Sequence, residues 1–257
     1  LVFTSTNCEL NQATGGFMKK VILTVLLILA ATVARGDLET HSPTIETPPG
    51  PAWEPLTDVV VKWAQTPDPQ GEALASQLAA DYPFDARSAD DFLCEDGAPV
   101  VAVEWWGSYW NPGAPPYADH FVLRFYSDLE ASPHNRPGEL LYEENCLAYA
   151  EEADGSVYHY SCTLDTPFEQ EAGSVYWLSV QAVHGFFSGS QWGWLECVSE
   201  DCWNSEATLV FPELGIPQWT AMSLATGAYH ELAFVLYGNV VSPAERVAWS
   251  RIKAMFR

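Results

Sequence analysis

The chain has 257 residues, of which 48% are hydrophobic and 13% aromatic, so it carries enough apolar side chains for a packed core. Lys and Arg number 11 against 34 Asp and Glu, which gives a formal net charge of −23. A surface this acidic repels phosphate backbones, so the composition argues against nucleic-acid binding by the main body.

Three segments precede the predicted domain. Residues 1–17 lie before the first Met and are interpreted as a mis-called upstream extension. Residues 18–36 have the pattern of a secretory signal peptide, with Lys19 and Lys20 followed by about 14 apolar residues and then small ones. Because a membrane span needs about 20 residues, we predict cleavage and no transmembrane span in the mature chain. A short uncleaved anchor is the alternative. Residues 37–56 contain five Pro and are predicted to be a linker.

The body of the chain reads as a series of short strands separated by Gly, Pro, Asn and Asp clusters. Only Gln70–Ala80 has helical composition, and its weak period predicts a long loop with one turn. Short strands without intervening helices predict an all-β domain over 57–240, an antiparallel β-sandwich or jelly roll. The predicted strands are Asp58–Trp63, Pro99–Trp106, His120–Ser127, Glu139–Glu143, Val157–Leu164, Ser174–His184, Gln191–Cys197, Ala207–Phe211 and Glu231–Gly238.

Residues 241–257 differ from the body in charge and pattern. Ser242, Pro243 and Glu245 fit a helix N-terminus with a capping box, and the apolar residues that follow recur at helical spacing. The last fourteen residues hold four basic side chains and one acidic one, whereas residues 37–243 hold four basic and 32 acidic ones. We predict a short basic amphipathic helix. It either docks on the acidic body or serves as a sorting or partner-docking tag.

Export would permit disulfides, and five Cys follow the leader. Cys146 and Cys162 flank an acidic hairpin-like loop, and Cys197 and Cys202 could close a small loop, so both pairs are disulfide candidates. Cys94 is then left over, although other connectivities stay open.

Calcium is the metal that the sequence favours, if any is bound. Asp90, Asp91 and Asp96 offer clustered hard oxygen ligands of the kind that Ca²⁺ takes, although no EF-hand spacing is present. Solvated acidic loops are the competing interpretation. Scattered His and the absence of C-x-x-C argue against zinc, and no other cofactor is predicted.

The densest motif is W-W-G-S-Y-W at residues 105–110. On a strand, its aromatic rings would lie on both faces, and two further Trp two residues apart would share a face. Indole rings spaced in this way can stack on sugar rings while nearby carboxylates accept hydroxyl hydrogen bonds. Packing in the core is the alternative. The candidate ligand-binding residues are Trp105, Trp106, Tyr109, Trp110, Trp192 and Trp194.

Several linked motifs resemble an uncharacterised domain family of secreted bacterial proteins. They span roughly 57–238 and include V-V-V-K-W at 59–63, D-D-F-L-C at 90–94, W-W-G-S-Y-W at 105–110, P-G-E-L-L-Y at 137–142, G-S-V-Y-W-L at 173–178, W-G-W at 192–194 and E-L-A-F at 231–234. The resemblance implies an extracellular β-sandwich-like domain with no assigned activity, so it supplies no catalytic residues.

The expected function is therefore non-catalytic binding or surface interaction, outside the cell or at its surface. The expected partner is an extracellular polysaccharide or a cell-surface component. One alternative is a structural cell-envelope module without a ligand. Another is a glycosidase that uses an Asp/Glu pair. No catalytic residue is predicted, because the sequence contains no G-x-S-x-G, H-E-x-x-H or P-loop motif. The oligomeric state stays open.

Overall fold

The computed structural model describes residues 56–110, 118–186 and 191–239. The predicted upstream extension, the signal peptide, the linker up to residue 55 and the C-terminal helix therefore lie outside the described residues. Among the residues that are described, no helix is long and apolar enough to cross a membrane.

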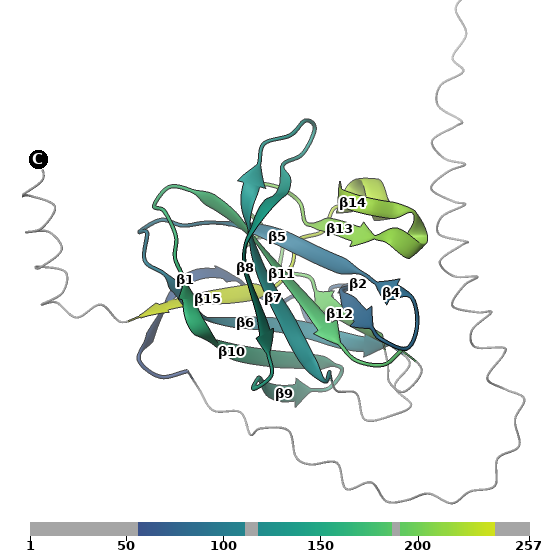
Figure 1. Cartoon of the computed structure of the whole chain (residues 1–257), viewed down its shortest axis with the longest axis horizontal. Helices are drawn as coiled ribbons and strands as arrows, with labels where there is room; N and C mark the ends of the chain where they lie inside the picture. Colours follow the sequence, from purple (N-terminus) through teal and green to yellow (C-terminus); the bar gives the residue numbers. More distant parts are fainter. Residues whose placement is uncertain (1–55, 111–117, 187–190, 240–257) are drawn as a thin grey trace, which may run out of the picture.

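The chain forms two sheets (Figure 1). The first has seven strands in the order β1-β15-β6-β10-β9, with β12 pairing β6 and carrying β2 at its edge. Its strands are β1 (Val59–Gln65), β2 (Ala73–Ala75), β6 (Val100–Trp110), β9 (Ala150–Asp154), β10 (Val157–Phe168), β12 (Gln191–Leu195) and β15 (Phe234–Asn239). Strand β6 is the centre of this sheet, since β10 lies on one side of it and β15 and β12 share the other side.

The second sheet has eight strands and is built around β11. Its strands are β3 (Gln77–Ala79), β4 (Phe84–Asp85), β5 (Arg87–Leu93), β7 (His120–Leu129), β8 (Arg136–Cys146), β11 (Val175–Val183), β13 (Thr208–Phe211) and β14 (Ile216–Ala221). All pairings in the two sheets are antiparallel except β3 with β11. Two short helices, η1 (Pro212–Leu214) and α2 (Met222–Thr226), flank β14. The predicted all-β sandwich is confirmed.

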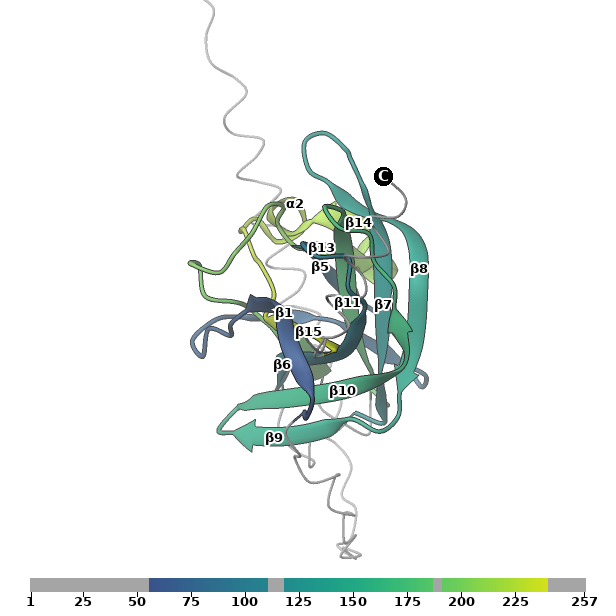
Figure 2. The ribbon, with the colours of Figure 1, turned by 90° about the vertical axis from the view of Figure 1, so that its left-hand side faces the viewer.

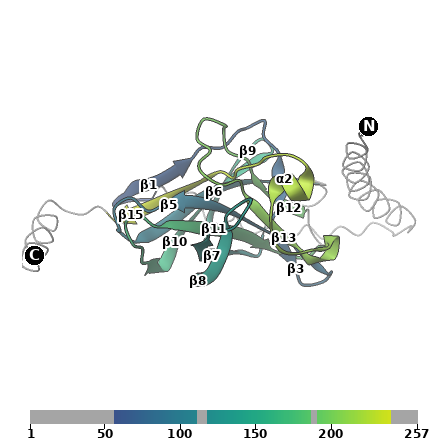
Figure 3. The ribbon, with the colours of Figure 1, turned by 90° about the horizontal axis from the view of Figure 1, so that it is seen from above.

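The two sheets face each other with their strands crossing steeply, as Figure 2 shows for β10 and β9 against β7 and β8. Seen from above, β1 and β15 lie at one end of the domain, and α2 lies toward the other end (Figure 3).

Aromatic side chains fill the space between the sheets. Trp105 on β6 is fully buried and stacks on Tyr160 of β10, with ring centroids 5.6 Å apart. Phe121 of the opposite sheet packs against both Trp105 and Trp192. The buried aromatic surface is a large part of what stabilises the fold, because burying one such ring contributes about 2–3 kcal/mol.

All nine predicted strands are present, but the sequence pattern missed six others. The long loop predicted for Gln70–Ala80 is wrong in part, because it contains β2 and β3. Strand β5 was also missed, because its sequence R-S-A-D-D-F-L is mostly polar although most of it is buried. Several of its polar groups are hydrogen-bonded within the core: Ser88 N, for example, donates to Ser76 Oγ at 3.1 Å, and Ser88 Oγ donates to the Ala75 carbonyl at 3.0 Å.

Candidate functional site

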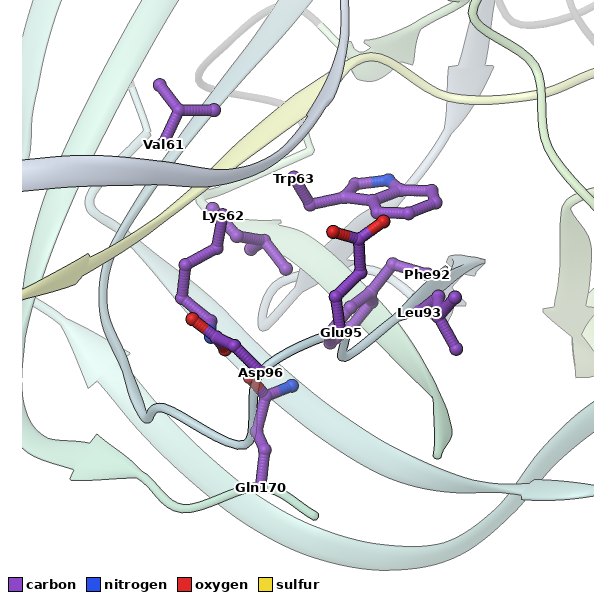
Figure 4. Close-up of a pocket in the computed structure, with 9 residues that line it drawn as sticks. Val61, Lys62, Trp63, Phe92, Leu93, Glu95, Asp96 and Gln170 are labelled. Carbon is purple, nitrogen blue, oxygen red and sulfur yellow. The ribbon is translucent and has the colours of Figure 1, made fainter. Parts of the chain in front are cut away.

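A pocket of about 110 Å³ opens where β1 and β15 meet the turn after β5. That volume is enough for about three or four water molecules or for one edge of a larger ligand. Figure 4 shows Trp63, Phe92 and Leu93 on one side, next to the Glu95 carboxylate, and Lys62, Asp96 and Gln170 on the other. The lining residues are Val61, Lys62, Trp63, Phe92, Leu93, Glu95, Asp96, Gln170 and Leu236.

An ion pair between Lys62 and Asp96 forms part of the polar wall. The Lys62 side chain is only 7% exposed, because its aliphatic stem lies across Gly238 of β15. A Cβ at Gly238 would lie 2.7 Å from Lys62 Cδ, so glycine leaves the room that this side chain needs. Partial burial tends to raise the pKa of Asp96, but the hydrogen bonds from Lys62 and from the Ala98 N–H, together with the charge of Lys62, outweigh it and hold this pKa below its usual range.

Gln170 is the unusual residue of the pocket. It follows β10, it is 9% exposed, and neither its Oε1 nor its Nε2 has a hydrogen-bond partner in the described part of the chain. Its amide points toward the Lys62–Asp96 pair (Figure 4). A buried amide without partners costs about 1–3 kcal/mol. An incoming polar group could remove that cost.

Trp63 forms the apolar counterpart and connects the pocket to the interior. Its ring packs against Trp203 in a T-shaped arrangement with ring centroids 5.1 Å apart, and its Nε1 donates a hydrogen bond to Gln65 Oε1 at 2.8 Å. Gln65 Nε2 in turn donates to Asp90 Oδ2 at 3.1 Å. The orientation of the Trp63 indole is therefore fixed by a hydrogen-bond chain that reaches the core.

Asp90 belongs to a cluster of buried carboxyl groups behind the pocket. Its Oδ2 also accepts from Leu232 N at 2.6 Å, and its carboxyl interacts with the buried carboxyl of Glu231. Burial raises the pKa of both groups, and for Glu231 the charge of Asp90 adds to the effect. Tyr229, which is 57% exposed, donates to Glu231 and links the pair to the surface.

Asp91 is buried next to this pair but has different partners. Its Oδ2 accepts from Asn204 Nδ2 at 2.6 Å and from Ser205 N at 3.3 Å. Burial, together with the charge of Asp90, raises the pKa of Asp91 to about 8. Asp90 and Asp91 thus face opposite sides of β5.

The three predicted calcium ligands do not come together. Asp90 and Asp91 point to different partners, and Asp96 is engaged by Lys62. Across the ranges that the structure describes, no group of three His, Cys, Asp or Glu side chains is placed to hold a metal ion.

The six predicted ligand-binding aromatics separate into two groups. Trp105, Trp192 and Trp194 are fully buried and Tyr109 is 8% exposed, so these four rings pack in the core. Trp106 and Trp110 lie on the outer face of the first sheet. Trp106 stacks on His159 with centroids 4.4 Å apart, and Trp110 is 36% exposed.

Glycine explains why the W-W-G-S-Y-W and W-G-W motifs occur together. A Cβ on Gly107 would lie 2.4 Å from the Trp192 ring, and one on Gly193 would lie 2.9 Å from the Trp110 ring. Each glycine therefore provides the space in which a tryptophan of the paired strand lies flat.

The cysteine predictions fall on described residues. Cys146 and Cys162 form a disulfide that joins β8 to β10, with Cα atoms 6.4 Å apart. Cys197 Sγ and Cys202 Sγ are 3.1 Å apart without a bond, and Cys94 is buried.

Sequence reasoning missed Lys62 and Gln170 as site residues. Lys62 had a usable signal, since it is one of four basic residues between positions 37 and 243. No sequence signal identified Gln170, because its neighbours Glu169 and Glu171 make it resemble part of a solvated acidic turn.

Comparison with known proteins gives one positive result. No curated protein and no solved structure matches the chain. A family model described as a domain of unknown function, DUF7901, matches residues 61–237. The matched segment begins in β1 and ends in β15, so it covers both sheets and every residue that lines the pocket. The chain therefore belongs to the DUF7901 family of domains of unknown function.

Proposed function

We propose that this domain is a non-catalytic extracellular binding module whose pocket accepts a neutral, hydroxyl-rich group of a polysaccharide. The observation that carries the proposal is the unpartnered amide of Gln170 in the pocket wall. A planar amide presents one donor and one acceptor side by side, which suits two adjacent hydroxyl groups. The Trp63 ring on the opposite side suits the apolar face of a sugar.

The charges of the pocket favour a neutral ligand. Lys62 and Asp96 neutralise each other, and Glu95 adds one negative charge at the rim. The body around them is strongly acidic. Anionic sugars would therefore be repelled.

The arrangement of carboxyl groups supports binding rather than hydrolysis. Glycosidases hold two carboxyl groups about 5–9.5 Å apart on either side of the bound sugar. Asp90 and Glu231 are instead both buried in the core and do not line the pocket. Of the two acids that do line it, Asp96 is engaged by Lys62.

A structural module without a ligand is the second candidate. It is favoured by the burial of Trp105, Trp192 and Trp194, which serve as core residues rather than as a platform. A glycan array that includes neutral and anionic polysaccharides separates the two functions. If the domain binds no glycan on the array, the structural module is the better supported function.

The variant Gln170→Leu tests the site itself. For a neutral glycan that binds on the array, this variant should weaken binding at least about tenfold, since two hydrogen bonds are lost. The same variant should raise the free energy of unfolding by about 1–2 kcal/mol, because an unsatisfied amide is replaced by an apolar group. The control is Trp110→Ala on the outer sheet face, which should leave binding unchanged. If Trp110→Ala abolishes binding and Gln170→Leu does not, the ligand binds at the outer face and the pocket assignment is wrong.

A further inference from the structure

A larger groove of about 830 Å³ shares Gln170 with the pocket and lies between the end of β7, the middle of β8, the loop after β10 and the start of β11. Its apolar surface includes Leu141, which is 45% exposed, together with Val175 and Tyr176. The groove thus offers apolar surface that some other group could cover.

The rest of the groove wall is acidic. No Lys, Arg or His side chain lines it, and four acids do: Asp128, Glu130, Glu169 and Glu171. Asp128 accepts hydrogen bonds from Asn135 and Trp177, whereas the three Glu are exposed. None of these acids belongs to an ion pair within the described ranges. The matching partner is a segment that is both apolar and basic.

The chain itself contains such a segment. Residues 244–257 carry Arg246, Arg251, Lys253 and Arg257 against a single Glu, with apolar residues that include Trp249 and Phe256. The basic residues of the body are less available, because three of those four, Lys62, Arg87 and Arg124, already pair with acids. Residues 244–257 therefore supply four of the eight basic residues after the predicted leader, and three of the other four are already engaged by acids of the body.

The groove is within reach of this segment. A Cβ at Gly238, near the end of β15, would lie 3.3 Å from the Pro99 carbonyl oxygen, and the next residue, Val100, pairs with Phe168 at the groove. Strands lie about 4.8 Å apart, so the end of β15 is roughly 10 Å from the groove. Residues 240–243 can span up to about 13 Å. Figure 1 shows the end of β15 and the turn between β10 and β11 on the same side of the domain.

We propose that residues 244–257 bind intramolecularly in this groove, with their basic side chains on Glu130, Glu169 and Glu171 and their apolar side chains over Leu141 and Val175. The interaction covers the exposed apolar surface and neutralises part of the acidic wall. It does not depend on the ligand proposed for the pocket, although a segment bound here would lie against Gln170.

Zero-length carbodiimide cross-linking of the full chain, read by peptide mass spectrometry, tests the proposal. Lys62 and Lys253 are the only lysines after the predicted leader, so the products are few. The Lys62–Asp96 pair provides an internal positive control. Lys253 should be joined to Glu130, Glu169 or Glu171, in a fraction that does not change on dilution. Cross-links mainly to other acids, links that disappear on dilution, or no Lys253 link while Lys62 reacts would each overturn the proposal.

Limited trypsin digestion provides a second readout. The double variant Glu169→Gln, Glu171→Gln should be cleaved after Arg246 and Arg251 about tenfold faster than the parent, the effect of losing two exposed ion pairs. A concentration of 0.5 M NaCl should have a similar effect on the parent. The matched control is Glu152→Gln, Asp154→Asn on β9, which should leave the rate unchanged. Equal cleavage rates in all three proteins would contradict docking in this groove.

Discussion

Raising the pH through neutrality should destabilise this protein because of Asp91. The pKa of this buried carboxyl is raised from 3.8 to about 8 by burial and by the charge of Asp90. The folded state therefore keeps a proton that the unfolded chain has already released. The stabilisation is complete below about pH 4 and is lost as the pH rises to about 8.

The magnitude follows from the number of protons bound. One group that is protonated only in the folded state changes the free energy of unfolding by about 1.4 kcal/mol per pH unit. Burial lowers the pKa of His184 below 6.5, and this group contributes the opposite slope at lower pH. The effect of Asp91 is therefore easiest to measure between pH 6.5 and pH 8. Over this interval Asp91 alone should lower the free energy of unfolding by about 2 kcal/mol. The Asp90–Glu231 pair, with its raised pKa values, adds a loss of the same sign.

Urea unfolding monitored by tryptophan fluorescence at several pH values measures this slope. The variant Asp91→Asn keeps an oxygen acceptor for Asn204 and Ser205 but has no proton to lose. Its slope over this interval should be smaller than that of the parent by about 1.4 kcal/mol per pH unit. Asp154→Asn, an exposed position on β9, is the control and should keep the parent slope. Identical slopes for the parent and Asp91→Asn would refute the protonated state inferred for Asp91.

Two further predictions concern packing and redox state. Gly107→Ala should lower the free energy of unfolding by about 1–3 kcal/mol, because its new Cβ would overlap the buried Trp192 ring. Thr163→Ala, exposed on the neighbouring strand, should change stability by less than about 0.5 kcal/mol, and similar melting temperatures for both variants would argue against the glycine requirement. Cys197 and Cys202, with Sγ atoms 3.1 Å apart, should form a second disulfide in protein prepared without reductant. Alkylation of the denatured, unreduced protein should then modify only Cys94 among the five Cys from position 94 onward, and label on Cys197 or Cys202 would contradict the pairing.

Sequence alone determined the class of fold and the positions of nine of its strands. Alternating apolar residues between turn signals identified nine strands, and the flanking positions of Cys146 and Cys162 identified the disulfide that the structure contains. These features are local, because a half-buried strand imposes its period on its own residues. The net charge and its concentration in the body are likewise properties of composition.

Tertiary structure decided the meaning of the aromatic and acidic motifs. Alternation predicted which rings of W-W-G-S-Y-W share a face, but which face is buried depends on the opposite sheet, and that sheet covers Trp105 while Trp110 stays partly exposed. In the same way, Asp90 and Asp91 resembled solvated calcium ligands, whereas both are buried and bonded to residues distant in sequence, Leu232 and Asn204. The pocket combines β1, the turn after β5, the loop after β10 and β15, so no local pattern could reveal that Gln170 lies beside Lys62 and Trp63. Whether a side chain is exposed depends on long-range contacts, and only the folded chain brings these together.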